Sequence, residues 1–453
     1  MTDGSIWSVA PLVLLGLAAI LAMVLAPIQP TPRVRIAAAL PMALAVIILL
    51  ARLGAPEAPV SMLLADDGMA RLGSALAAAA GLGILSFTRT ICTGREGPAL
   101  VAIAAAGGVA LASANHGATL FLGLELTTLP MVALALMPRT EAAVEAGYKL
   151  FLIAGVGAGA LLMGLVFGFG ASGSLRLDAW SVDGPVAAIG LAFVLVGLSV
   201  KFALVPFHMW SPDLFAGAPA PVGAIAGSIS KVAVAIAALR IGLSLPAPEI
   251  WTLGLLLAGG AAVILGNLAA LRQDNLLRML GYSSIAHSGY IALVLSVGGE
   301  LMGETVLVYV ASYAPAIVAA FAVAGLMGTG TRLEDLRGLA WSRPLAGVAL
   351  GVALLSMAGL PPAVGFVAKI YLFSTLAGEA AWGPLVIAAI GSALGFAYYL
   401  RFAVRIFTAP RQPAPRATLN RADAVAMAAS IALLITLGLY PEPLTSLVAA
   451  SLP

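Results

Sequence analysis

Residues 192–231 read AFVLVGLSVKFALVPFHMWSPDLFAGAPAPVGAIAGSISK, a long apolar stretch that is broken by Pro206 and by a Pro/Gly-rich turn. Lys201 lies in the apolar run before the break, and Lys231 lies in the run after it. A lysine at the centre of a membrane helix costs ~2.5–3.5 kcal/mol on insertion scales. Two lysines beside one broken segment therefore indicate a functional site within a membrane, and the rest of the chain is interpreted around them.

The composition favours a polytopic membrane protein. Of the 453 residues 61% are hydrophobic and 9% are charged, whereas soluble domains carry ~25% charged residues. Long apolar runs in lipid form helices, because every backbone group must find its partner within the segment. The single cysteine, Cys92, excludes a disulfide framework or a thiolate cluster. Three scattered histidines are too few to form a metal-binding site within this chain, and a net charge of +3 does not indicate nucleic-acid binding.

Hydropathy predicts an all-α membrane domain, 1–453, of about fourteen transmembrane helices. The first run is too long for a signal-peptide core and lacks a basic flank, so we expect a first span there. The longest connection, Arg401–Arg421, is predicted to be a Pro-rich exposed loop. The predicted spans are 6–26, 34–52, 69–88, 98–114, 117–137, 142–170, 186–206, 218–240, 250–271, 276–298, 302–328, 345–376, 384–408 and 423–448.

The arginines predict the orientation of these spans. Fifteen arginines fall in loops on one side, and four fall on the other. Because cytoplasmic loops are enriched in basic residues, both termini are predicted to be periplasmic, in a bacterial inner membrane. The four arginines of the periplasmic side are Arg52, Arg71, Arg176 and Arg240.

All four lysines of the chain, Lys149, Lys201, Lys231 and Lys369, fall within predicted spans, whereas every loop cation is arginine. Arginine holds its proton under almost all conditions, but a desolvated lysine can release one. This partition therefore predicts proton exchange at the lysines. The alternative is that the lysines extend to helix ends or hold helices together, above all Lys149, which is near the start of its span.

Glu125, in TLFLGLELTTLP, is the acidic residue that sits clearly inside a predicted span. A buried carboxylate needs a cation nearby, so we expect a lysine of a neighbouring helix as its partner. The alternative is a protonated carboxyl group that is hydrogen-bonded to a nearby backbone.

A second break is predicted in SMAGLPPAVGFVAK, residues 356–369, where Pro361 and Pro362 cannot continue a helix. Interrupted helices at matching places in two halves are typical of inverted repeats in transporters. The seventh and twelfth spans are broken, which predicts two inverted five-helix repeats, 98–240 and 250–408. Three helices precede them in 1–97, and one helix follows in 423–448.

The tenth span, RMLGYSSIAHSGYIAL, is unusually polar. Ser283, His287 and Tyr290 share one helix face, so this row could carry protons. The serines more simply hold helices together, whereas for His287 the two interpretations remain open. His208, in PFHMW, could also assist proton transfer or could be a hydrogen-bonding group at the break. His116 is given no special role.

Several motifs resemble the antiporter-like membrane subunits of respiratory complex I, namely KFALVPFHMWSPDLFAGAPAPV, RMLGYSSIAHSGY, LRGLA and MAGLPPAVGFVAK. The resemblance covers nearly the whole chain. It is nearest to the N-type branch, because GAIAGSISK lacks the usual histidine stretch of other branches and Lys369 stands where M-type subunits have glutamate. APAPV replaces the more usual APTPV. The ionisable residues of the family map onto Glu125, Lys149, Lys201, Lys231 and Lys369.

The resemblance implies a proton-translocating subunit of an NADH:quinone oxidoreductase, with these five residues as the relay. FMN, iron–sulfur clusters and quinone are then expected in partner subunits and no cofactor in this chain, which has neither a nucleotide motif nor a thiolate set. The implied partners are the M-, L-, K-, J-, A- and H-type subunits, together with membrane lipid. Two alternatives remain open: a subunit of a cation/proton antiporter or of a membrane-bound hydrogenase, and a passive scaffold of the membrane arm.

Overall fold

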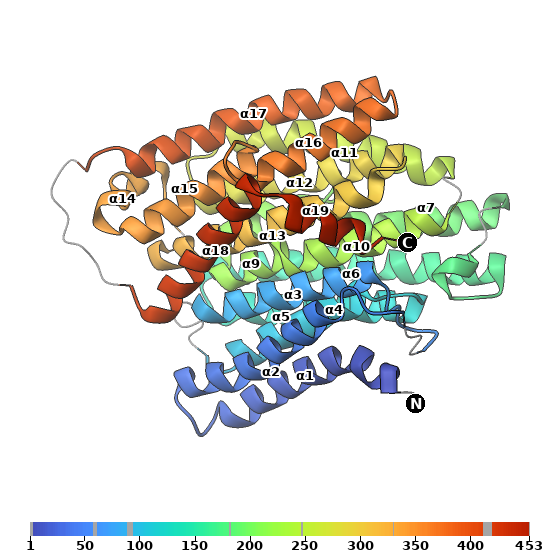
Figure 1. Ribbon diagram of the computed structural model, residues 1–453, viewed down its shortest axis with the longest axis horizontal. Helices are drawn as coiled ribbons and strands as arrows, with labels where there is room; N and C mark the ends of the chain where they lie inside the picture. The colour runs from blue at the N-terminus through green and yellow to red at the C-terminus, as the bar shows by residue number, and fades with distance from the viewer. Residues whose placement is uncertain are drawn as a thin grey trace.

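The computed structural model describes residues 3–57, 61–87, 94–180, 183–245, 248–328, 330–410 and 419–452. These ranges form α-helices and short 3-10 helices, and no strand (Figure 1). The all-helical prediction is therefore confirmed. Cys92 and most of the Pro-rich loop lie outside the described residues.

The helices follow one another as α1 (Asp3–Leu25), α2 (Thr31–Ala51), α3 (Gly68–Phe87), α4 (Gly97–Ala112), α5 (Gly117–Leu136), α6 (Glu141–Ser172), η2 (Leu177–Ala179), α7 (Gly184–Phe202), α8 (Trp210–Gly217), α9 (Ala220–Gly227), α10 (Ile229–Ser244), α11 (Glu249–Leu271), α12 (Leu276–Val297), α13 (Met302–Met327), η3 (Leu333–Leu336), α14 (Leu339–Ser342), α15 (Pro344–Ala358), α16 (Val364–Gly378), α17 (Trp382–Phe407), α18 (Arg421–Leu439) and α19 (Glu442–Ala449).

Twelve helical segments among the described residues are long and apolar enough to cross a membrane, counting α9 and α10 as one. The shorter α4 and the pair α15 and α16 are also apolar. Each of the fourteen predicted spans thus corresponds to one helix or to two consecutive helices, which confirms a polytopic membrane protein.

Both predicted breaks are present. Helix α7 ends at Phe202, and Ala203 then adopts a left-handed conformation with φ 56° before the chain turns into α8. Helix α15 ends at Ala358, and Gly359 has φ 78° before α16 begins at Val364. Pro206 and Pro361 follow within three residues of these turns, and each removes a backbone donor that a continuing helix would need.

Two predicted spans that were expected to be continuous are also interrupted. The eighth, 218–240, is divided into α9 and α10 at Ser228, where φ is −113° and ψ is −79°. The last, 423–448, is divided into α18 and α19 at Pro441, which lacks a backbone donor. Apolar residues flank both interruptions, so hydropathy alone did not reveal them.

Helices α10 and α13 form the centre of the bundle. All of the most apolar 18-residue window within 220–244 is buried, and 94% of the corresponding window within Met302–Met327 is buried. Small residues allow neighbouring helices to approach closely. A Cβ atom on Gly107 would lie 2.5 Å from the backbone of Leu126, and one on Gly123 would lie 2.6 Å from the backbone of Leu111. Helices α4 and α5 therefore pack backbone to backbone.

The two predicted five-helix units show matching contacts. Helix α4 packs on α5 as α11 packs on α12, and α6 packs on α7 and α8 as α13 packs on α15 and α16. Likewise α7 contacts α10 as α15 contacts α17. The inverted-repeat division remains a prediction that this pattern supports.

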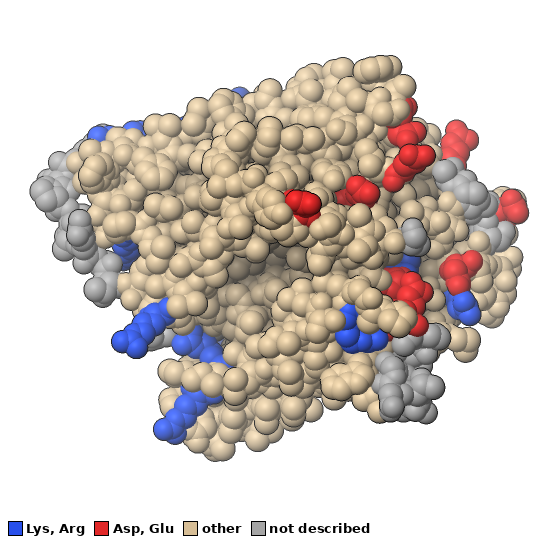
Figure 2. Space-filling model, in the orientation of Figure 1, with Lys and Arg blue, Asp and Glu red and all other residues tan. Residues whose placement is uncertain are grey.

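The charged residues separate between the two ends of the helices. Figure 1 places both termini at one end of the bundle, and on the face drawn in Figure 2 acidic side chains gather at that end. Lysine and arginine side chains dominate the opposite end of this face. This distribution is the one that a basic cytoplasmic face and periplasmic termini would produce, although which side of the membrane each end faces remains a prediction.

An ion network at the end that carries the termini joins the first three helices to the central bundle. Asp66 accepts hydrogen bonds from Ser8 of α1 at 2.6 Å, from Arg52 at 2.7 Å and from Arg71 of α3 at 2.9 Å. Asp67, the next residue, accepts two from Arg240 of α10 at 2.6 and 3.0 Å. Three of the four arginines predicted for the periplasmic side thus act as structural cations.

The two carboxyl groups of this network titrate at low pH. Burial raises the pKa of Asp66, but the hydrogen bonds from Arg71, Ser8 and Arg52 outweigh it, and the pKa is lowered overall. Burial likewise raises the pKa of Asp67, and the hydrogen bonds and charge of Arg240 lower it by more. Because the folded-state pKa is depressed, the stabilisation is present above the unfolded-state pKa, which is ~3.9, and is lost as the pH falls through the folded-state value.

Replacing Asp67 with asparagine is expected to lower the melting temperature of the detergent-solubilised protein at pH 7, because Arg240 loses its carboxylate. The cost is roughly 1–3 kcal/mol. The difference from the native protein should shrink as the pH falls below ~4. Asp178→Asn, in an exposed pair with Arg176, is the control and should change little. An Asp67→Asn defect that is independent of pH would contradict this account.

Candidate functional site

Three of the four lysines lie buried in the middle of the bundle. Lys201, in the last turn of α7, is 6% exposed, Lys231 near the start of α10 is 3% exposed, and Lys369 of α16 is 7% exposed. Each lysine stands beside a helix interruption. Two of these interruptions are the predicted breaks, beside Lys201 and Lys369, and the third is the interruption at Ser228, beside Lys231.

Lys201 reaches α5 but makes no ion pair there. Its Nζ donates to the hydroxyl of Thr128 at 2.7 Å and, at 3.4 Å, to the carbonyl of Leu124. No nitrogen–oxygen distance of 4.0 Å or less joins it to Glu125 in the part of the chain that the structure describes. The predicted direct ion pair is thus absent from this structure, although Glu125 and Lys201 are near enough to interact electrostatically.

Glu125 lies towards the outside of the bundle. It shares its side of α5 with Leu122 and Leu129, which are 57% and 53% exposed. Glu125 itself is half-buried, and its Oε1 atom is shielded from solvent without a hydrogen-bond partner among the described residues. The Glu125 carboxyl group therefore lies between Lys201, which is inside the bundle, and the outer surface of α5, where another subunit could bind.

Lys231 is held by oxygen atoms on two sides. Its Nζ donates to the carbonyl of Phe202 at 2.8 Å and to that of Ser284 at 3.1 Å, and it contacts the Ser288 hydroxyl. In a continuous helix the N–H group of residue 206 would bond to the Phe202 carbonyl. Because proline stands at that position, the carbonyl is left for Lys231.

Lys369 also has neutral partners. Its Nζ donates to the hydroxyl of Ser392 in α17 at 2.7 Å and lies 3.9 Å from the centre of the Tyr290 ring. A cation over an aromatic face is attracted by the negative potential of the ring. No carboxylate lies within 4.0 Å of any of the three buried ammonium groups in the described residues, so no acidic group locks their charge in place.

His287 of α12 lies between Lys231 and Lys369. Its Nδ1 atom is 2.8 Å from the Tyr309 hydroxyl, and its Nε2 atom is 3.0 Å from the Tyr399 hydroxyl. The imidazole ring also packs on Tyr313, with 4.6 Å between ring centres. A neutral imidazole has one donor and one acceptor nitrogen, and a tyrosine hydroxyl can fill either role. His287 can therefore pass a proton between its two neighbours.

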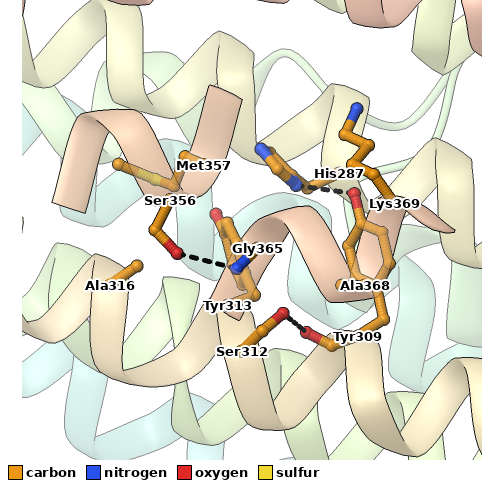
Figure 3. Close-up of a pocket in the computed structure, with 10 residues that line it drawn as sticks. All are labelled: His287, Tyr309, Ser312, Tyr313, Ala316, Ser356, Met357, Gly365, Ala368 and Lys369. Carbon is orange, nitrogen blue, oxygen red and sulfur yellow. Dashed lines mark hydrogen bonds between the residues drawn. The ribbon is translucent and has the colours of Figure 1, made fainter. Parts of the chain in front are cut away.

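A small cavity connects His287 with Lys369 (Figure 3). It is lined by residues of α12, α13, α15 and α16, and its volume is about 10 Å³. This is close to the ~10–15 Å³ that one water molecule needs. On the Lys231 side, the hydroxyl groups of Tyr313 and Ser284 are buried without a hydrogen-bond partner among the described residues. Tyr313 lines the cavity and could bond to such a water molecule, and the Ser284 hydroxyl lies beside that of Tyr313.

Lys149 differs from the other three lysines. It lies in α6 as predicted, but its side chain is 42% exposed and pairs with Glu145 at 2.5 Å and Asp213 at 2.7 Å. Asp213 also approaches Arg278 at 3.2 Å. The sequence analysis missed Asp213, because residues 207–217 fell between two predicted spans and no helix was expected there. The Lys149–Asp213–Arg278 group holds α8 between α6 and α12.

The other two histidines, His208 and His116, have local roles. His208 lies in the turn between α7 and α8, and its Nδ1 atom is buried without a hydrogen-bond partner among the described residues. His116 caps α5 by accepting from the backbone of Ala118 at 3.1 Å. Neither histidine contacts the three buried lysines by any hydrogen bond found in the described chain.

Sequence reasoning also missed most of the tyrosines of the site. Tyr309 and Tyr313 are four residues apart in YVASY of α13, so they share a helix face. Tyr398 and Tyr399 form the YY pair of α17, and the Tyr398 hydroxyl donates to Asn267 at 3.0 Å. Tyrosine pairs within apolar runs indicate hydroxyl groups inside the bundle. The contacts of Tyr309, Tyr313 and Tyr399 with His287 depend on how α12, α13 and α17 pack together.

Comparison with known proteins places this arrangement in a family. Residues 114–395 match the family described as NADH:quinone oxidoreductase/Mrp antiporter, TM. NADH-quinone oxidoreductase subunit N of Rhodopseudomonas palustris is 45% identical, over 100% of this chain and 99% of the relative. The subunit N of Cereibacter sphaeroides is 46% identical, over 98% of both chains.

Solved structures show the same fold. A chain of respiratory complex I from Thermus thermophilus, in a structure with bound aureothin, has a TM-score of 0.88 and 36% identity, covering 97% of this chain and 100% of that one. A chain of an archaeal membrane-bound sulfane sulfur reductase has a TM-score of 0.89 at 24% identity, covering 98% of this chain and 96% of its own length. A chain of the Mrp complex from Dietzia sp. has a TM-score of 0.89 at 19% identity, covering 100% and 97%. The last two comparisons show the fold alone.

Replacing Gly365 with alanine should disrupt the second break. The added Cβ atom would lie 1.8 Å from the carbonyl oxygen of Ser356, so α15 and α16 must separate and Lys369 must move. Forced overpacking of this kind costs ~1–3 kcal/mol or more, and thermal unfolding of the assembled complex measures it. Gly159→Ala is the control, because nothing lies within 4 Å of its Cβ position. Equal stability of the two variants would contradict the described packing.

Proposed function

This chain belongs to the subunit N family of NADH-quinone oxidoreductase, and we propose that it translocates protons within the membrane arm of such a complex. The observation that carries the proposal is a row of buried titratable groups through the bundle. The row runs from Glu125 through Lys201 and Lys231 to His287 and Lys369. Buried cations are costly in a membrane protein, and they persist where they serve transport.

The first step of the proposed relay joins Glu125 and Lys201. The Lys201 ammonium group now donates to Thr128, three residues along α5 from Glu125. A change in the side-chain rotamer would exchange this neutral partner for the carboxylate. A carboxylate favours the protonated lysine, whereas desolvation beside a neutral hydroxyl favours proton release. Glu125 thereby controls how readily Lys201 gives up its proton.

The second step passes from Lys201 to Lys231. The two residues are linked through the break, because Lys231 donates to the carbonyl of Phe202, the residue after Lys201. Movement of the α7 end would therefore change the surroundings of both ammonium groups at once. We place Lys231 at the centre of the relay, where it receives the proton from the α5–α7 side.

The third step crosses from Lys231 to Lys369. Ser284 accepts from Lys231 through its carbonyl, and its hydroxyl lies beside that of Tyr313. From there the route continues through His287 and the water-sized cavity to Lys369. This assigns His287 to the main route and leaves His208 as a structural or accessory group at the break. Lys149 adjusts the relay indirectly, by fixing α8 through Asp213.

The free energy for this cycle must come from other subunits. We infer that FMN, iron–sulfur clusters and quinone are held by partner subunits, and that the M-, L-, K-, J-, A- and H-type subunits complete the membrane arm. The outward position of Glu125 supports a neighbour on α5, since a carboxyl group facing lipid at mid-membrane is costly. The basic end of the bundle would face the cytoplasm of a bacterial cell, with both termini periplasmic.

The sequence identities and the geometry of the site disfavour two other functions. A subunit of a cation/proton antiporter would share the fold, but the Mrp chain is 19% identical whereas subunit N relatives are 45–46% identical. A passive scaffold would need no buried cations. The lysines here are bonded to neutral oxygen atoms and an aromatic ring. Apolar residues could take their place if the interior were only structural, so the scaffold hypothesis does not explain the lysines.

Alanine at Lys201 or Lys231 should abolish the relay while leaving the complex assembled. We expect NADH-driven proton pumping in membrane vesicles to fall to about a tenth or less, in line with the loss of a positioned proton-transfer group. Glu125→Ala should likewise reduce coupled turnover more than assembly. Arg176→Ala, which removes an exposed cation, is the control. An assembled Lys231→Ala complex with full electron transfer and full proton stoichiometry would show that the relay is wrong.

The Tyr313 hydroxyl group should be needed for the crossing to Lys369. Tyr313→Phe removes only this group, so we expect pumping to slow by about 10²-fold, the low end of the ~10²–10⁴-fold range for proton-transfer groups, with normal assembly. A larger solvent deuterium isotope effect should accompany it. Tyr440→Phe, at an exposed tyrosine, is the matched control. Unchanged pumping and isotope effect in Tyr313→Phe would exclude this route.

A further inference from the structure

A large apolar groove lies on the side of α13 that faces away from the relay. It has a volume of about 630 Å³ and runs between α3, α13 and α18, where Figure 2 shows the surface hollowed. Small side chains dominate its lining and leave the space between the helices unfilled. They include Ala79, Gly83, Ala314, Ala322, Ala426 and Ala429.

Water is a poor occupant for this groove. A buried water molecule needs about two to four polar partners, but the serine hydroxyls of the lining are already used. Ser86 donates to the carbonyl of Gly83 at 2.7 Å, and Ser430 donates to that of Ala426 at 2.9 Å. An empty groove would forfeit dispersion contacts along all three helices. The occupant is therefore expected to be hydrocarbon.

The size of the groove selects among hydrocarbon occupants. The observed volume lies within the ~300–1,000 Å³ that is typical of sites for small molecules. A flexible chain of methylene groups fits a groove of this volume that runs along three helices and is lined mainly by small apolar side chains.

A cation marks one end of the groove. Arg421, the first residue of α18, lines the groove and is exposed, and no ion pair holds its guanidinium group in the part of the chain that the structure describes. Arg35 lies behind the same end and donates to the carbonyl of Ser86 at 2.9 Å. Asp423, in the first turn of α18, is buried and hydrogen-bonded to Asn420. On the face drawn in Figure 2, basic side chains gather at this end of the hollow.

We propose that this groove binds an acyl chain of an anionic phospholipid, with the lipid phosphate against Arg421. Guanidinium groups bind phosphate oxygens through paired hydrogen bonds, and the start of α18 adds the positive end of a helix dipole. The lipid would then form the outer support of α13, whose opposite face carries Tyr309 and Tyr313. This binding site is independent of the proposed relay chemistry.

Photo-crosslinking in the assembled complex tests the site. The purified complex is reconstituted with phosphatidylglycerol that carries a diazirine in one acyl chain, and labelled peptides are identified by mass spectrometry. Ala426→Phe and Ala429→Phe fill the groove, and Ala428→Phe places the same ring on the outer side of α18. Filling the groove should lower labelling of α3 and α13 at least about fivefold, whereas Ala428→Phe should leave it unchanged.

The phosphate contact is tested separately, with a variant that changes no packing. Arg421→Gln should remove the preference for labelled phosphatidylglycerol over phosphatidylcholine with the same chains, whereas Arg33→Gln, at the same end but outside the lining, should preserve it. Equal labelling of the Ala429→Phe and Ala428→Phe complexes would show surrounding bilayer lipid only and overturn the site. Labelling by a prenylquinone probe in preference to the phospholipid, or an adduct to a neighbouring subunit, would overturn it as well.

Discussion

The site depends on one constraint, the requirement that a backbone carbonyl group at membrane depth finds a donor. Pro206 has no N–H group, so it cannot bond to the carbonyl of Phe202 in the preceding turn. The ammonium group of Lys231 replaces that donor at 2.8 Å. The missing donor of Pro206 thus leaves the Phe202 carbonyl open to Lys231, which also bonds to Ser284 and Ser288 of α12. The same contact joins the segments that carry Lys201 and Lys231, which makes the break part of the relay.

The chain uses its two kinds of cation for opposite purposes. Arg71 and Arg240 are bound to Asp66 and Asp67 by several short hydrogen bonds, and this network is suited to holding helices in place. The three buried lysines bond instead to hydroxyl groups, carbonyl groups and an aromatic ring. Neutral partners stabilise an ammonium group less than a carboxylate does, so its proton can be transferred at a smaller cost. Rigid ion pairs lie at the end of the bundle, and exchangeable charges lie in its middle.

Much of this site could be predicted from composition and spacing. Lysine, arginine and proline have physical consequences that do not depend on their neighbours, so both breaks and the membrane position of the lysines were recognisable. The interruption at Ser228 was not, because serine is compatible with a helix and the apolar run continues across it. Asp213 was also missed, because hydropathy does not distinguish a span that continues into a second short helix from a span that is followed by a turn. The absence of a Glu125–Lys201 ion pair depends on rotamers that no sequence pattern specifies.

The amino-acid sequence by itself determined the membrane class, the broken helices and the identity of the buried cations, because desolvation costs and missing backbone donors are properties of single residues. The tertiary structure alone decided which groups meet. Tyr309, Tyr399 and His287 come from three helices, and their contact follows from how α12, α13 and α17 pack. It also decided that Lys149 is exposed, since burial depends on what neighbouring helices cover and not on the hydropathy of the helix itself.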